Sequence, residues 1–188
     1  MKTNIIKYGC WTLLAFITVG CNDFLNVEQK GRTTIPAFLS NPGGLKAGLA
    51  GTYNTLYAYY DNEFMKYPEV MGNMSSMNLS SGSSMLEQYN FTPNPGDGTT
   101  SYYIWKRMAE AMTNANNIIQ YEPAVESAYP AQAAECRQIL GQALLIRAMV
   151  HFDMVRVYAQ PYNYTSDASH IGVPVQTKAP GPDDNLAR

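Results

Sequence analysis

The residues that could catalyse a reaction are few, and their spacing does not favour catalysis. Paired carboxylates can act as general acid and base, and the nearest pairs are Asp61 with Glu63 and Asp183 with Asp184. Both pairs lie beside tyrosines or prolines, which favours a solvated surface. The sequence contains no phosphate-binding loop, dinucleotide-binding glycine pattern, zinc-spaced Cys/His set or nucleophile elbow. We therefore expect a protein that is not an enzyme, with no catalytic residue, no metal and no cofactor.

Tyrosine and asparagine offer a different chemistry. An aromatic ring stacks on the C–H face of a sugar ring, and amide side chains bond to neighbouring hydroxyls. The stretch from 57 to 103 is rich in both types, and its ligand-binding candidates are Tyr67, Asn73, Tyr89, Asn90, Tyr102 and Tyr103. The set predicts an uncharged, hydroxyl-rich ligand, although each tyrosine taken singly is equally well explained as a core residue.

The first twenty residues predict an export signal. Lys2 and Lys7 precede an apolar run over 8–19. This run is shorter than the roughly 20 residues that a helix needs to cross a bilayer. The run ends in Thr18-Val19-Gly20-Cys21, which resembles the lipobox of bacterial lipoproteins. We expect a signal peptide over 1–20 and lipidation of Cys21, with an ordinary secretory signal as the alternative.

Composition limits the remaining classes of protein. The chain has 188 residues, of which 46% are hydrophobic and 15% charged, with a formal net charge of −2. This composition is typical of a globular domain and excludes a disordered, collagen-like or coiled-coil chain. There is no basic stripe for phosphates, so we expect no nucleic-acid partner. We expect one domain over 21–188.

Apolar periodicity predicts three main helices. They cover about 45–60, about 101–121, and about 131–158, with a shorter candidate over 36–40. The second should end before Pro123, because the residue before a proline disfavours helical geometry. Residues 61–100 read as a long loop, in which Tyr89 and Phe91 alternate with polar residues and could form a short strand.

The pattern also predicts how these helices pack. The second and third helices should form an antiparallel hairpin, with Trp105 and Met112 against Ile139, Ala143 and Ile146. The third helix carries apolar residues over a wide arc, so it should pack between at least two other helices. Cys136 and His151 are expected to be structural residues of this helix. Gly48 and Gly51 suggest that another backbone approaches the first helix closely.

Several stretches, taken in order, resemble the SusD/RagB family of outer-membrane nutrient-binding lipoproteins, in its N-terminal portion. The similar stretches are Cys21-Asn22-Asp23-Phe24-Leu25, residues 49–56 (LAGTYNTL), residues 67–73 (YPEVMGN), residues 105–119 (WKRMAEAMTNANNII), residues 143–158 (ALLIRAMVHFDMVRVY) and Gly172-Val173-Pro174. Asn73 stands where the family more often has Asp.

The resemblance implies an all-α fold of tetratricopeptide-like helical hairpins with long loops, an incomplete α-solenoid. It implies a lipid-anchored, surface-exposed protein of the outer membrane that binds an oligosaccharide or polysaccharide and delivers it to a TonB-dependent, SusC-like transporter. Capture of peptide rather than glycan, and a tetratricopeptide-like scaffold that binds only protein, remain the alternatives. Trp105, Arg147 and Asp153 fall in helical signatures that look structural in the family, so they are not assigned to ligand.

Overall fold

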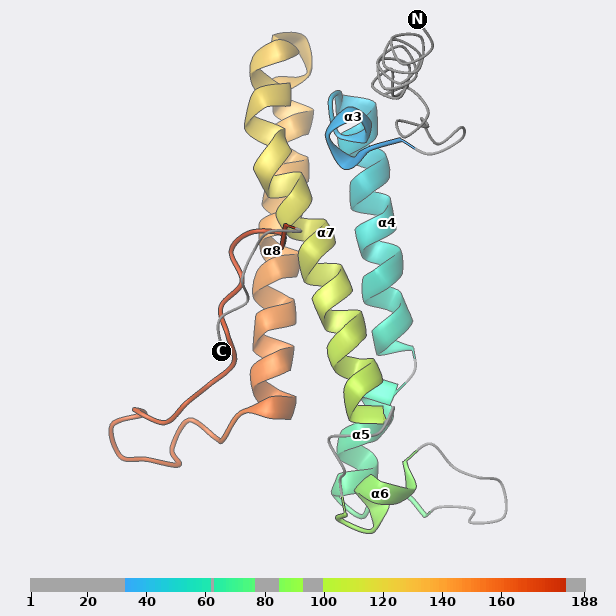
Figure 1. Ribbon diagram of the computed structural model, residues 1–188, viewed down its shortest axis with the longest axis vertical. Helices are drawn as coiled ribbons and strands as arrows, with labels where there is room; N and C mark the ends of the chain where they lie inside the picture. Colours follow the sequence, from blue (N-terminus) through green and yellow to red (C-terminus); the bar gives the residue numbers. More distant parts are fainter. Residues whose placement is uncertain (1–32, 62, 77–84, 93–99, 182–188) are drawn as a thin grey trace, which may run out of the picture. The chain divides into compact units, whose positions relative to one another are not determined.

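The computed structural model describes residues 33–61, 63–76, 85–92 and 100–181. Residues 1–20, which are expected to form a signal peptide, and Cys21 lie outside these residues. Within them the chain forms only helices and loops, with no strand (Figure 1). The elements are α3 (Ile35–Phe38), α4 (Pro42–Tyr60), α5 (Glu63–Met71), α6 (Leu86–Tyr89), α7 (Thr100–Ala128), the 3-10 helix η2 (Pro130–Gln132) and α8 (Ala133–Tyr158). The all-α prediction is confirmed.

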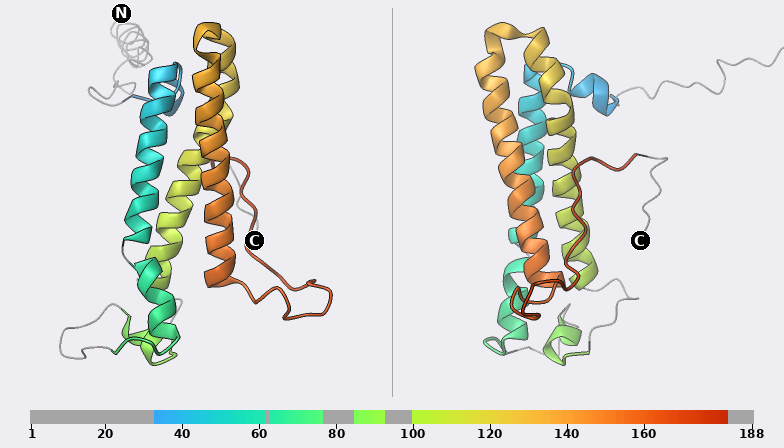
Figure 2. Two further views of the ribbon diagram at one scale, coloured as in Figure 1. Left: turned by 180° about the vertical axis from the view of Figure 1, so that it is seen from behind. Right: turned by 90° about the vertical axis from the view of Figure 1, so that its left-hand side faces the viewer.

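The long helices α4, α7 and α8 pack along one another (Figures 1 and 2). Paired contacts give their register. Helices α4 and α8 run parallel, since Lys46 meets Glu135 at 3.2 Å and Tyr59 meets Asp153 at 3.0 Å. Helix α7 runs antiparallel to α8, with Glu126 near Arg137 at one end of the pair. The hairpin that the sequence predicted is therefore present.

One expected packing partner was wrong. Trp105 is half-buried, and its ring meets Tyr158 edge-on with 5.0 Å between ring centroids. Tyr158 is near the end of α8, whereas Ile139 is near its beginning. An antiparallel hairpin with a tight turn must pair the start of α7 with the end of α8, and this excludes the predicted contact between Trp105 and Ile139. The buried core instead contains Ile104, Met108, Met112, Ala115 and Ile118 of α7, together with Ile139, Ala143, Ile146, Val150 and Met154 of α8.

Two predicted boundaries were also wrong. Helix α7 continues through Pro123 to Ala128, because Glu122 and Val125 on either side of the proline are buried in the described residues. Tertiary packing there outweighs the hydrogen bond that the proline ring removes. Residues 61–100 are not simply a loop, because they contain α5 and α6, and Tyr89 belongs to α6 rather than to a strand.

Glycine has its clearest role at the start of α4, which Asn41 caps by accepting a hydrogen bond from Gly44 N at 3.0 Å. A Cβ on Gly44 would lie 1.8 Å from the backbone oxygen of Phe38. The close backbone approach is therefore at Gly44. At Gly48 the neighbour is a side chain, Leu39 Cδ2 at 3.0 Å, and at Gly51 nothing lies within 4 Å, so the prediction for those two glycines was wrong.

Replacing Gly44 by alanine should lower the free energy of unfolding by about 1–3 kcal/mol, because α3 must move to admit the methyl group. The matched variant Gly51→Ala should instead gain up to about 1 kcal/mol from helix propensity, since its added methyl group meets nothing. Urea denaturation of the two variants measures whether each substitution lowers or raises the free energy of unfolding. Equal stabilities would contradict the packing described for α3.

Candidate ligand-binding surface

Five of the six predicted ligand residues lie in α6 or close to the ends of α5, α6 and α7, while Tyr67 lies in the middle of α5. Helix α5 contacts both α6 and α7, and Gln88 Nε2 of α6 donates to Ser101 Oγ in the first turn of α7 at 3.4 Å. The flanking residues Tyr89, Tyr102 and Tyr103 thus come from adjoining elements. We call the group Tyr89, Asn90, Phe91, Tyr102, Tyr103 and Asn73 the aromatic end.

Two tyrosines present their rings to solvent. Tyr102 is 53% exposed and Tyr103 is 48% exposed, and their rings meet edge-on with centroids 5.6 Å apart. Each carries an apolar face and a hydroxyl that can donate or accept. This pair is the part of the predicted surface best placed to stack on a ligand.

The remaining candidates differ in exposure. Asn73 and Asn90 are exposed, and Tyr89 is half-buried. Asn73 follows the end of α5 with φ of 55°, a left-handed geometry that asparagine tolerates better than most residues. Tyr67 is half-buried against the core, so it contributes packing at this end. The structure adds Phe91, which is 62% exposed and has φ of 55° directly after Asn90.

Phe91 was not among the ligand candidates because its alternation with polar neighbours suggested a strand. The signal that could have found it is the composition of the sequence Gln88-Tyr89-Asn90-Phe91, where aromatic and amide residues alternate. A bulky residue with positive φ costs of order 1–3 kcal/mol and persists only where its surroundings impose it. The hydrogen bond from Thr92 N to Glu87 O at 2.8 Å closes this turn.

The buried carboxylate of Asp153 links α8 to α4 through hydrogen bonds. Asp153 is 2% exposed and accepts hydrogen bonds from the hydroxyls of Tyr59 and Tyr60, while Arg156 Nη1 lies 3.2 Å from its other oxygen. Burial, followed by the nearby Asp153 charge, raises the pKa of Tyr59. At neutral pH the Tyr59 hydroxyl therefore keeps its proton and donates to Asp153. Asp153 is structural, as the sequence indicated.

A second network holds residues 173–177 across α7 and α8. Arg147 donates to Asn116 Oδ1 and to Thr177 O, each at 3.2 Å, and Asn116 Nδ2 donates to Gln176 O at 3.2 Å. His151 Nε2 accepts from Gln176 N at 3.0 Å, and its Nδ1 lies 2.8 Å from Arg147 O. Both ring nitrogens have backbone partners, which confirms the prediction of a satisfied structural histidine.

A second acidic side chain, that of Glu122, is buried in the last two turns of α7. Glu122 is 1% exposed, and its Oε1 has no hydrogen-bond partner among the described residues. Burial, followed by the charge of Glu126, raises the pKa of the Glu122 carboxyl. Burial, followed by the charge of Glu122, likewise raises the pKa of the Cys136 thiol, which is fully buried. Cys136 is therefore an inert thiol, as predicted.

The raised pKa of Glu122 gives a pH-dependent prediction. As pH rises, the Glu122 carboxyl loses its proton in the unfolded chain first, because its pKa there is about 4.5, below the pKa in the folded chain. The free energy of unfolding therefore falls as pH rises from about 4.5 through the higher folded pKa. Glu122→Gln should remove this loss and be more stable than the wild type by about 1 kcal/mol at pH 8, with little difference at pH 4. Urea midpoints across this range check it, and a wild type more stable than Glu122→Gln at pH 8 would contradict it.

The described residues hold no group of three or more His, Cys, Asp or Glu side chains that could bind a metal ion. In the same part of the chain, no helix has both the length and the apolar character to cross a membrane.

Residues 23–188 match a protein-family model of the SusD-like type, described as "Starch-binding associating with outer membrane". The chain belongs to this SusD-like family. No curated protein and no solved structure matches it. The match confirms the family that the sequence resembled. Its description indicates starch binding and association with the outer membrane.

Proposed function

We propose that this SusD-like chain captures neutral oligosaccharides at its aromatic end. The observation that carries the proposal is the exposed pair Tyr102 and Tyr103, with the exposed amides of Asn90 and Asn73 shortly after the adjoining helices α6 and α5. Stacking rings and amides together fit a ligand with an apolar C–H face and many hydroxyls. The family description names starch, so α-glucans are the first ligands to test.

Affinity electrophoresis tests this ligand class. The purified chain is run in native gels that contain soluble starch, another neutral polysaccharide or no polysaccharide. We expect retardation in starch and unchanged mobility in the empty gel. Unchanged mobility with every polysaccharide would reject glycan capture.

We further propose that 1–20 is a signal peptide and that a lipid on Cys21 anchors the domain over 21–188 to the outer membrane, exposed at the cell surface. The support is the lipobox-like sequence ending at Cys21 together with the family's membrane association. A single acyl chain binds a membrane only marginally, whereas several hold a protein firmly.

Metabolic labelling with an alkyne palmitate should mark the wild-type chain and leave Cys21→Ala unlabelled. Cys136→Ala is the matched control, because Cys136 is fully buried and should not affect labelling. Equal labelling of wild type and Cys21→Ala would reject the anchor.

The partner that receives the ligand is, in this proposal, a TonB-dependent SusC-like transporter. Its support is the resemblance to the family together with the outer-membrane association. Co-purification of the chain with such a transporter after mild detergent extraction is the expected result. Extraction of the chain without any transporter, from cells that express both, would contradict this partner.

One observation favours a second function, a tetratricopeptide-like scaffold that binds protein. Helix α8 exposes a row of large apolar side chains, namely Leu144, Leu145, Met149, Phe152 and Val155. These side chains form an apolar face of α8 that the rest of the described chain does not cover. A scaffold without glycan binding would give no retardation in any polysaccharide gel, so the same experiment separates the two functions.

A further inference from the structure

Residues 173–177, which we call the strap, are tied to α7 and α8 through backbone groups. The chain leaves the end of α8, makes a loop and returns alongside the long helices (Figures 1 and 2). The N–H of Gln176 donates to His151 Nε2 at 3.0 Å, and the carbonyl of Gln176 accepts from Asn116 Nδ2 at 3.2 Å. The carbonyl of Thr177 accepts from Arg147 Nη1 at 3.2 Å.

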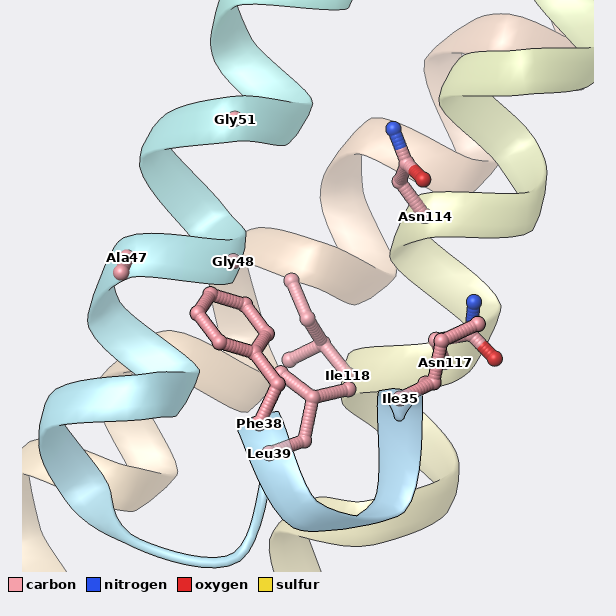
Figure 3. Close-up of a pocket in the computed structure, with 9 residues that line it drawn as sticks. All are labelled: Ile35, Phe38, Leu39, Ala47, Gly48, Gly51, Asn114, Asn117 and Ile118. Carbon is pink, nitrogen blue, oxygen red and sulfur yellow. The ribbon is translucent and has the colours of Figure 1, made fainter. Parts of the chain in front are cut away.

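The strap lies over a polar side chain of α7. Asn116 is only 1% exposed, and its amide bonds both to the strap and to Arg147. Its neighbours Asn114 and Asn117 instead line a groove between α3, α4 and α7, on a different face of the helix (Figure 3). Release of the strap would therefore take the partner of Asn116 Nδ2 away and leave the groove as it is.

The two bonds of the His151 ring determine where its proton lies. A backbone N–H can only donate, so Nε2, which accepts from Gln176, carries no proton. A backbone carbonyl can only accept, so Nδ1, at 2.8 Å from Arg147 O, carries the single proton of the ring. The bound strap thus requires a neutral imidazole. A second proton would go to Nε2 and set two N–H donors against each other.

The charged groups around His151 offer no partner to an imidazolium. On its own helix, Arg147 is a cation one turn before it, and the carboxylate of Asp153 is bonded to two tyrosines of α4. Helix α7 has no titratable residue from 111 to 120. The strap has none either, and Lys178 follows it directly. The one charged residue of α4 pairs with the first turn of α8, far from this ring.

We propose that His151 is a pH-sensitive clasp for the strap, in which the neutral ring holds Gln176 and a second proton on Nε2 releases it. A free histidine side chain takes up that proton at about pH 6.5. Because the bound ring cannot hold the proton and keep its bond, the ratio of released to bound strap rises about tenfold for each pH unit below this value. The strap is therefore held at neutral pH and loosened in mild acid.

Release has a defined consequence for the chain. It frees the buried amide of Asn116, withdraws Val173 from its contact with the core, and changes the path of the segment that follows α8. The bonds from Arg147 and Asn116 do not titrate in this pH range, so His151 alone supplies the pH dependence. The clasp does not depend on the proposed glycan function.

Amide hydrogen exchange of the ¹⁵N-labelled chain, measured by NMR and corrected for the intrinsic rate at each pH, tests the clasp. We expect the protection of the Gln176 amide to fall about tenfold between pH 7.5 and pH 5.5. The Leu45 amide, which donates to Asn41 O at 3.0 Å, should keep its protection and so report that the chain stays folded. The ¹⁵N shifts of the His151 ring should show the second proton arriving over the same pH range.

His151→Gln keeps an acceptor without the titration, because glutamine can place its amide oxygen near the position of Nε2. Its Gln176 amide should not lose protection at pH 5.5. His170→Gln is the matched control, since this histidine bonds to Thr165 Oγ1 within the loop after α8, and it should keep the wild-type pH dependence.

Three results would each overturn the proposal. The first is wild-type protection of Gln176 that does not change between the two pH values. The second is the same fall in His151→Gln as in the wild type. The third is a His151 ring that carries a proton on Nε2 while the Gln176 amide is still protected.

Discussion

Replacing Asp153 by alanine should lower the free energy of unfolding by about 3–5 kcal/mol. The change removes the carboxylate that accepts hydrogen bonds from the hydroxyls of Tyr59 and Tyr60, and Tyr59 is only 1% exposed. It also removes the ionic partner of Arg156. A buried hydroxyl that loses its charged acceptor commonly costs about 1–3 kcal/mol, and Asp153 accepts from two tyrosines. The Arg156 side chain is 54% exposed, so its loss of the ion pair adds little. Because a domain has only about 5–15 kcal/mol of stability, much of this chain should unfold at physiological temperature.

Glu110→Ala is the matched control for this prediction. Glu110 pairs with Arg107 at 3.0 Å with the same spacing of three residues along a helix, but both side chains are exposed. An exposed pair contributes at most about 1 kcal/mol, so this variant should melt close to the wild type. Equal midpoints in urea for Asp153→Ala and Glu110→Ala would show that the buried network does not hold α4 against α8.

Removing both exposed tyrosines of α7 should lower the affinity for maltoheptaose by about 30- to 100-fold. Each stacked ring is worth about 1–1.5 kcal/mol, and 1.4 kcal/mol corresponds to a factor of ten. The variant carries Tyr102→Ala and Tyr103→Ala, which are about half exposed, so its stability should change by no more than about 0.5 kcal/mol per site. Isothermal titration calorimetry measures the affinity.

Tyr129→Ala controls for loss of any exposed tyrosine. Tyr129 is 41% exposed and follows the far end of α7, opposite the aromatic end. It should bind maltoheptaose as the wild type does. A loss of affinity in Tyr129→Ala equal to that of the double variant would move the ligand away from Tyr102 and Tyr103.

Local signals predicted the helices that carry the fold. The three long helices were predicted because apolar residues recur every three or four positions. Asn114 and Asn116 make hydrogen bonds to other segments, which support the turn of α7 where asparagine is a poor helix former.

The errors came from interactions between distant segments. The continuation of α7 past Pro123 depends on burial of Glu122 and Val125, which periodicity cannot reveal. The pairing of Trp105 with Tyr158 depends on the register of the hairpin, which is set by the short connection through η2. The short helices α5 and α6 lie between polar stretches and lack a pattern of their own. Helix α5 depends on contacts with α4, α6 and α7, and α6 on contacts with α5.

The candidate site was predicted by residue type more than by position. The abundance of tyrosine and asparagine indicated the region from 57 to 103 as the binding site. In the structure, however, Tyr59 and Tyr60 donate hydrogen bonds to Asp153, and Tyr67 packs against the core. Whether a tyrosine faces water or core is decided by the helix packed against it. The groove between α3, α4 and α7 could not be predicted, because it joins residues from three elements.

The central claim is that this SusD-like chain binds glycan without acting on it. The most direct measurement is calorimetric titration of the purified chain with maltoheptaose, followed by chromatography of the same sugar after prolonged incubation. If the chain binds glycan without hydrolysing it, we expect saturable binding and recovery of intact maltoheptaose. Absence of binding heat, or the appearance of shorter maltooligosaccharides, would contradict it.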